Sequence, residues 1–172
     1  EFVSRKISNG VAEISLGLKK ELVLGNLKSK RDWGYAKEYM EAVHLMLQQD
    51  KPEDFVISTG KAYSVSHFAK LAFETVGLNW KKYVKTDRRF MRPSEVDYLC
   101  GNSKKAKIKL GWESKISFGE LVRMLVTEDM KRWKMFIDGK SFAWDAPLYP
   151  DEAKLITRSH QDSNSKRKKR KK

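Results

Sequence analysis

Residues 22–49 read LVLGNLKSKRDWGYAKEYMEAVHLMLQQ, and they combine an apolar strand-like run, a turn at Gly25 and a long amphipathic helix. Arg31 lies where the backbone approaches the helix, with Asp32 and Trp33 beside it. A guanidinium fixed at such a corner can offer two parallel N–H groups to a phosphate. A surface Arg paired with Asp32 is the alternative interpretation. Asp32 could also cap the helix, and the Trp33 ring could hold the corner by packing.

Helical and strand-like segments alternate on both sides of this stretch, which predicts an α/β fold. A run rich in Phe, Val, Ile and Thr at 54–59 suits a buried strand of a parallel sheet. Ser64 and Ser103 are candidate helix caps, and Ser117 with Glu120 has the spacing of a capping box. The expected helices are 2–16, 35–49, 65–76, 103–111 and 117–133, and the expected strands are 21–24, 54–59 and 80–86. One face of the second helix should be buried, with Ala36, Tyr39, Met40, Val43, Met46 and Leu47 on it.

The composition also predicts where the folded body ends. Residues 1–135 carry the sheet and helix elements, and two prolines, Pro147 and Pro150, mark an irregular arm at 136–156. Residues 157–172 are polar and basic without an apolar period, and we expect them to be disordered. The chain opens at Glu1 inside a helical pattern, so we expect it to be a fragment of a longer protein.

Composition excludes several protein classes. The 172 residues are 40% hydrophobic and 11% aromatic, which is typical of a globular protein with its own core. No apolar run reaches the roughly 18 residues of a membrane helix, and no secretory signal is recognisable. The one cysteine, Cys100, and three scattered histidines provide neither a disulfide nor a zinc spacing. We therefore expect a cytoplasmic protein with no membrane association and no metal.

The net charge of +14 is unevenly distributed, because residues 166–172 are all Lys or Arg. A run of like charges is usually solvated, although it could also contact nucleic acid. No aromatic residues interrupt it to stack on bases. We expect no nucleic-acid binding from the body and leave it open for the tail Lys166–Lys172.

Three cations far apart in sequence could serve one ligand. Lys6 lies on the first expected helix, Arg31 at the corner, and Arg92 before Pro93, which keeps the preceding backbone extended. A nucleotide diphosphate needs donors that converge from different elements, and open α/β sheets bind ligands beyond the carboxyl ends of their strands. Taken singly, Lys6 and Glu95 are more typical of a solvated helix face than of a binding site.

Motifs spread over residues 2–130 resemble, in their order, the GDP-mannose 4,6-dehydratase family of extended short-chain dehydrogenases. They are FVSRKI at 2–7, GNLKSKRDWG at 25–34, LMLQQD at 45–50, FVISTG at 55–60, RPSEVD at 92–97, KAKIKLGW at 105–112 and ELVRM at 120–124. The resemblance implies the C-terminal part of a Rossmann-type enzyme, with the substrate-binding subdomain and without the N-terminal cofactor-binding half.

The resemblance also implies which residues bind the substrate. Family positions that match this chain contact the GDP part of GDP-mannose, with Lys6 and Arg31 at the phosphates or the guanine region. Arg92 and Glu95 would form a clamp in which Glu95 accepts hydrogen bonds from ribose or base. The candidate substrate-binding residues are Val3, Lys6, Asn26, Arg31, Arg92 and Glu95.

The chemical centre of the family is absent from this sequence. No tyrosine is followed by lysine in a Tyr-x-x-x-Lys pair, and no Gly-x-x-Gly-x-x-Gly loop is present. By the resemblance, the catalytic residues and the NADP site lie upstream of residue 1. We expect no catalytic residue in this chain and no activity from the chain alone.

The implied reaction is an NADP-dependent dehydration. Oxidation at C4 of mannose, loss of water across C5 and C6 and return of the hydride to C6 give GDP-4-keto-6-deoxymannose, a precursor of GDP-fucose. The full-length enzyme is expected to be a homo-oligomer. Two alternatives stay open: a reductase or epimerase of another sugar nucleotide, and a non-catalytic basic module that binds nucleotides or nucleic acid.

Overall fold

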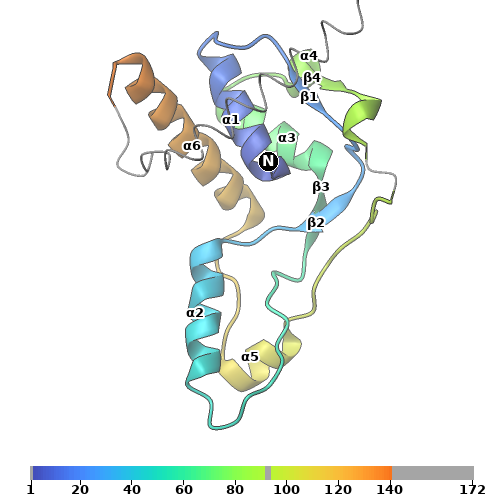
Figure 1. Cartoon of the computed structure of the whole chain (residues 1–172), viewed down its shortest axis with the longest axis vertical. Coiled ribbons are helices and arrows are strands. Elements are labelled where there is room, and N and C mark those ends of the chain that lie inside the picture. Colours follow the sequence, from blue (N-terminus) through green and yellow to red (C-terminus); the bar gives the residue numbers. More distant parts are fainter. Residues whose placement is uncertain (1, 92–93, 141–172) are drawn as a thin grey trace, which may run out of the picture. The chain divides into compact units, whose positions relative to one another are not determined.

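The computed structural model describes residues 2–91 and 94–140, which confirm the α/β prediction (Figure 1). The chain divides into two compact units, residues 1–133 and 134–172. The elements are α1 (Val3–Ser15), β1 (Leu22–Leu24), β2 (Lys30–Asp32), α2 (Ala36–Leu47), β3 (Ala62–Ser64), α3 (Val65–Thr75), α4 (Trp80–Tyr83), β4 (Val84–Thr86), the 3-10 helix η1 (Arg88–Phe90), α5 (Lys104–Leu110) and α6 (Phe118–Ile137). Across the described residues, no helix combines the length and apolarity needed to cross a membrane.

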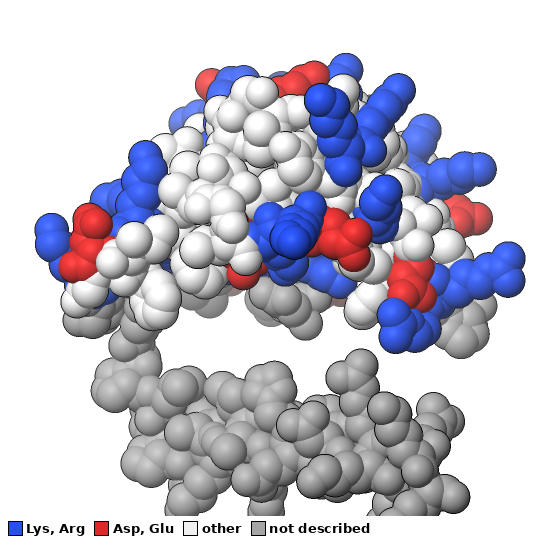
Figure 2. Space-filling view, turned by 90° about the horizontal axis from the view of Figure 1, so that it is seen from above, with Lys and Arg blue, Asp and Glu red and all other residues white. Residues whose placement is uncertain are grey.

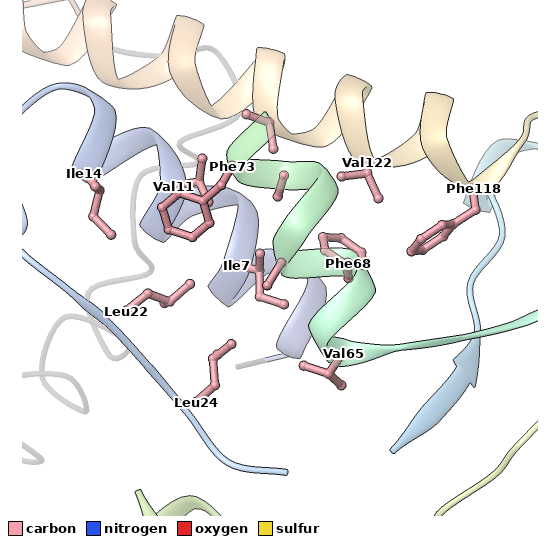
Figure 3. Close-up of a cluster of buried hydrophobic side chains, with 13 residues drawn as sticks. Ile7, Val11, Ile14, Leu22, Leu24, Val65, Phe68, Phe73, Phe118 and Val122 are labelled. Carbon is pink, nitrogen blue, oxygen red and sulfur yellow. The ribbon is translucent and has the colours of Figure 1, made fainter. Parts of the chain in front are cut away.

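The main core of the first unit is built by α1, α3, α6 and β1. Apolar residues at i, i+4 and i+7 of α1, namely Ile7, Val11 and Ile14, belong to one buried cluster with the aromatic side chains of α3 (Figure 3). Phe68 and Phe73 of α3 are fully buried there. The remaining buried members are Leu22, Leu24, Val65, Ala69, Ala72, Phe118, Val122 and Val126.

Two short strand pairs accompany this core. β1 pairs in parallel with β4, with Leu22 opposite Val84 and Leu24 opposite Thr86. β2 pairs antiparallel with β3, so that Arg31 lies opposite Tyr63. The first pair brings the carboxyl ends of two strands together, and the second anchors the Arg31 corner next to the start of α3.

A second, smaller cluster joins α2 to α5. Ala42 packs with Ala106, Leu110 and Trp112. Glu38 of α2 is buried, and its carboxylate accepts hydrogen bonds from the Ser114 hydroxyl and the N–H groups of Lys115 and Ile116 (2.9–3.2 Å). The backbone that follows α5 is therefore held against α2.

Most helix ends form as the local sequence predicts. The Ser64 hydroxyl accepts a hydrogen bond from the His67 N–H (3.1 Å) and caps α3. Ser117 and Glu120 make both bonds of the predicted capping box at the start of α6. Gly111, at φ 66°, ends α5 in the left-handed conformation that glycine adopts without strain.

Several other predictions were wrong. Residues 54–59 form no strand; Phe55 and Ile57 instead pack against the α2–α5 cluster. Residues 80–83 are helical because the Asn79 side chain caps α4, so the strand begins only at 84. Ser103 makes no side-chain cap bond; the Asn102 carboxamide accepts from the Lys104 N–H instead.

The face of α2 was also predicted incompletely. Tyr39 and Met46 pack on the second cluster, but Met40, Val43 and Leu47 are exposed. α6 continues to Ile137, beyond the expected end near Trp133. The predicted arm beyond residue 140 and the predicted disordered tail 157–172 lie outside the described residues.

Candidate functional site

The site begins at the edge where β1 and β4 end together. Pairing continues past the strands, because the Asp87 N–H donates to the Leu24 carbonyl (2.9 Å). The turn at Gly25 follows β1, and η1 follows β4, so the two segments leave the pair side by side (Figure 1). Loops at the carboxyl ends of parallel strands are where open α/β sheets bind their ligands.

Gly25 allows η1 to approach the turn closely. A Cβ at this position would lie 2.2 Å from the Phe90 carbonyl oxygen, a distance that no side chain could tolerate. The Asp87 carboxylate accepts from the Arg89 N–H (2.9 Å) and holds the first residues of η1. Glycine at 25 therefore has a steric reason in the structure.

Lys6 reaches this edge from α1. Its Nζ lies 3.9 Å from the centroid of the Phe90 ring, a cation–π geometry. Lys6 is half-buried, whereas the Phe90 side chain is 51% exposed. One face of the molecule carries many more Lys and Arg than Asp and Glu side chains, which favours anionic ligands (Figure 2).

Arg31, on β2, forms an ion pair with Glu95, and its second terminal nitrogen donates to the Lys30 carbonyl (2.8 Å). Both side chains are largely buried, with 24% of Arg31 and 21% of Glu95 exposed. The Lys30 N–H donates to the Asp97 carbonyl (2.7 Å) and the Leu99 N–H to the Lys30 carbonyl (3.1 Å). These bonds form an isolated parallel bridge between Lys30 and Tyr98, which holds the segment that carries Glu95 close to Arg31.

Asp32 does not cap α2, contrary to the sequence prediction, and it does not pair with Arg31. Its carboxylate accepts hydrogen bonds from the Thr59 N–H (3.0 Å), the Thr59 hydroxyl (2.6 Å) and the Gly60 N–H (2.9 Å). Tyr35 occupies the N-cap position of α2 without a side-chain bond. Asp32 therefore holds the loop at residues 59–60 against the corner, the segment at residues 31–34 that joins β2 to α2.

The predicted packing of Trp33 is confirmed. Its ring lies 5.3 Å from that of Phe68 and 5.6 Å from that of Phe118, measured between centroids. The corner is thus anchored to the main core on one side and to the 59–60 loop on the other. Arg31, on the short strand β2, directly precedes the two anchoring residues, Asp32 and Trp33.

The other candidates occupy different settings. Val3, in the first turn of α1, is half-buried against the main core. The Asn26 side-chain oxygen accepts from the Lys28 N–H (2.9 Å), so it shapes the turn after β1. Arg92 and Pro93 lie outside the described residues. The structure thus joins Arg31 with Glu95, and Lys6 with the Gly25–Phe90 edge.

The ionised side chains of Asp87 and Arg89 hold each other in place next to this edge. The Arg89 guanidinium and N–H, which both bond to the Asp87 carboxylate, hold the pKa of Asp87 below its ordinary value. Asp87 therefore stays ionised and bound to Arg89 at neutral pH, which keeps the first turn of η1 in place.

Sequence reasoning missed two residues of the site. Phe90 escaped notice because an aromatic residue in a basic loop carries no motif, although its place two residues before Arg92 was a usable signal. The role of Asp32 depends on residues 59–60, which are distant in sequence, so local spacing suggested a helix cap instead.

The comparisons of the sequence with family models and curated proteins agree on one family. A family model described as GDP-mannose 4,6 dehydratase matches residues 1–125. GDP-mannose 4,6 dehydratase 2 of Arabidopsis thaliana is 48% identical over 140 residues, which cover 80% of this chain and 38% of the relative. The human GDP-mannose 4,6 dehydratase is 46% identical over 147 residues, with 76% of this chain and 40% of the relative covered.

Solved structures show the same fold. RMD from Pseudomonas aeruginosa, solved as a complex with NADPH, superposes with a TM-score of 0.69 at 17% identity and covers 76% of this chain and 43% of its own. This likeness confirms the expected fold of a Rossmann-type extended short-chain dehydrogenase. The chain spans about two fifths of the length of the curated relatives it matches.

Proposed function

The chain belongs to the GDP-mannose 4,6-dehydratase family, and we propose that it supplies the GDP-binding part of a dehydratase that acts on GDP-mannose. The proposed contacts are Val3, Lys6, Asn26, Arg31, Arg92 and Glu95. Family membership over 125 residues supports the substrate, and the geometry of the corner supports the site.

The Arg31–Glu95 pair is the observation that carries the proposal. Each terminal guanidinium nitrogen has two hydrogens, so the bonds to Glu95 and to the Lys30 carbonyl leave further donors for a phosphate. Glu95 holds the guanidinium plane, which reduces the conformational entropy lost when a ligand binds. A largely buried, oriented Arg is suited to a bidentate phosphate contact.

Lys6, Asn26 and Arg92 complete the proposed contacts. Lys6 would bring a point charge to the diphosphate from α1, and the Asn26 amide nitrogen stays available because only its oxygen serves the turn. Arg92 would join from the segment that leads from Phe90 to Glu95. These donors come from different elements, as a diphosphate site requires.

The cofactor is proposed to be NADP, which would supply the hydride-transfer chemistry of this reaction. The residues of this chain do not fit a dinucleotide site: the sequence has no Gly-x-x-Gly-x-x-Gly loop and no Tyr-x-x-x-Lys pair. We therefore assign neither cofactor contacts nor catalytic roles to them. Their part is to bind and orient the nucleotide end of the substrate, in a homo-oligomeric enzyme.

The test uses a joined protein, in which the part of the Arabidopsis relative that this chain does not match is attached to residues 1–172. The joined protein should bind NADP and convert GDP-mannose to GDP-4-keto-6-deoxymannose, measured by the absorbance of the 4-keto product in alkali. The 172-residue chain alone should give no product.

Two results would contradict the proposal. One is a joined protein that binds NADP but shows no calorimetric signal with GDP-mannose. The other is equal affinity for GDP-mannose and UDP-glucose, which would assign the site to a different sugar nucleotide.

A further inference from the structure

Lys6 is held at the strand edge by an aromatic ring instead of a carboxylate. In the described part of the chain, no acidic side chain pairs with its ammonium, and its Nζ lies 3.9 Å from the Phe90 ring centroid. A lysine has a long flexible stem, so an unheld ammonium would sample many positions. The ring face attracts a cation without neutralising it, so the positive charge stays available.

Phe90 is itself fixed by its backbone. The Phe90 N–H donates to the Asp87 carbonyl (3.1 Å), and the Asp87 N–H in turn donates to the Leu24 carbonyl at the end of β1. The Phe90 carbonyl approaches Gly25 so closely that no side chain would fit at position 25. The ring therefore projects from a rigid support while 51% of its surface stays exposed. A half-exposed ring contributes little to the core, and so core packing does not explain this placement.

We propose that Phe90 is a positioning residue that holds the Lys6 ammonium where it meets the diphosphate of the substrate; this inference rests on the proposed function. A carboxylate at position 90 would also hold Lys6, but it would offset the charge of the ammonium, as Glu95 does in part for Arg31. An aromatic face avoids that conflict, because it orients the cation and presents no competing negative charge.

The experiment uses the joined protein and the variants Phe90→Leu, Phe90→Tyr and Lys6→Met. Phe90→Leu keeps the apolar bulk and removes the ring, so KM for GDP-mannose should rise about 3- to 10-fold with kcat nearly unchanged. Phe90→Tyr should restore KM. In a Lys6→Met background, Phe90→Leu should have no further effect, because the residue acts through Lys6.

Phe55→Leu is the matched control, because Lys105 lies over the Phe55 ring (4.8 Å to the centroid) in a similar contact away from the strand edge. It should leave KM unchanged. The proposal would be overturned by the same rise of KM for Phe90→Leu with and without Lys6, or by no rise at all.

A ligand-free readout separates this inference from the proposed function. The ring current of Phe90 should shift the ε-methylene protons of Lys6 upfield in the NMR spectrum, and Phe90→Leu should abolish that shift. Absence of the shift in the parent protein refutes the positioning by Phe90. A shift in a parent protein that binds neither GDP-mannose nor GDP leaves the contact between Phe90 and Lys6 in place but refutes the proposed function, and with it the assignment of Lys6 to the diphosphate.

Discussion

Asp32 is the residue on which the corner next to Arg31 depends most directly. Its carboxylate accepts from the N–H groups of Thr59 and Gly60 and from the Thr59 hydroxyl, and a longer bond reaches the Gly101 N–H (3.4 Å). Bonds to an ionised acceptor contribute about 1.5–3 kcal/mol each. Loss of this one side chain should therefore free a whole loop.

We predict that Asp32→Ala in the joined protein speeds hydrogen exchange at the amides of residues 59–60 by about 10- to 100-fold. Asp32→Asn should give a smaller increase, because its single oxygen accepts fewer of these bonds. Asp50→Ala, at an exposed position after α2, serves as the control and should change nothing. Unchanged protection in Asp32→Ala would contradict the role assigned to this carboxylate.

The sequence alone predicted the contacts between neighbouring residues but not those between residues far apart in the chain. The Ser64 cap, the Ser117–Glu120 box and the Gly111 stop were predicted correctly because each depends on residues at most a few positions apart. The ion pair between Arg31 and Glu95 joins residues 64 positions apart. Both were expected to meet the ligand, but their pairing depends on the bridge between Lys30 and Tyr98, which no local pattern encodes.

Among the elements, α1 and α6 are joined by a buried polar contact. Asp129 of α6 is fully buried, accepts a hydrogen bond from the Ser8 hydroxyl (2.6 Å) and forms an ion pair with Arg5. Both partners come from the first half of α1. The Arg5 side chain is 41% exposed, so water can solvate it when Asp129 is removed, but the buried Ser8 hydroxyl would lose a bond to a charged acceptor. Such bonds contribute about 1.5–3 kcal/mol.

Asp129→Ala should accordingly lower the free energy of unfolding of the chain by about 1.5–3 kcal/mol in urea titrations followed by tryptophan fluorescence. Glu74→Ala is the control: Glu74 pairs with Lys70 at 3.7 Å on an exposed face of α3, and its loss should cost less than about 0.5 kcal/mol. Similar losses for the two variants would show that the contact between α1 and α6 carries no special weight.

Two of the wrong predictions, the strand at 54–59 and the buried face of α2, share one physical cause: both depend on partner segments that are distant in sequence. Residues 54–59 have the composition of a buried strand, yet a strand needs neighbouring backbone to bond with. In the structure the Thr59 N–H is taken by Asp32 instead. The predicted face of α2 was likewise a correct helical pattern, of which α5 and Trp112 cover only one side.

At the scale of the whole molecule, the side of α2 that α5 leaves uncovered should make the chain self-associate. Met40, Val43 and Leu47 recur at i, i+3 and i+7 and are 60%, 40% and 77% exposed. A contiguous apolar stripe of this kind promotes association. We predict that the 172-residue chain self-associates at micromolar concentrations, measured by analytical ultracentrifugation, and that Leu47→Glu shifts it toward the monomer.

Ile108→Glu is the comparison for that experiment. Ile108 on α5 is 72% exposed and does not belong to the α2 stripe, so its replacement should leave association unchanged. A monomeric parent chain, or equal effects of the two variants, would contradict a specific role for the α2 face.

The central claim is that Arg31, oriented by Glu95, binds the diphosphate of GDP-mannose. Isothermal titration of the joined protein tests it most directly, with Arg31→Ala compared with Lys28→Ala, an exposed lysine in the same turn. Arg31→Ala should weaken GDP-mannose binding by about 2–4 kcal/mol, Arg31→Lys should rescue it in part, and NADP binding should not change. Lys28→Ala should cost well under about 1 kcal/mol. Equal losses for Arg31→Ala and Lys28→Ala would mean that the turn is a diffuse basic surface and would contradict the assigned site.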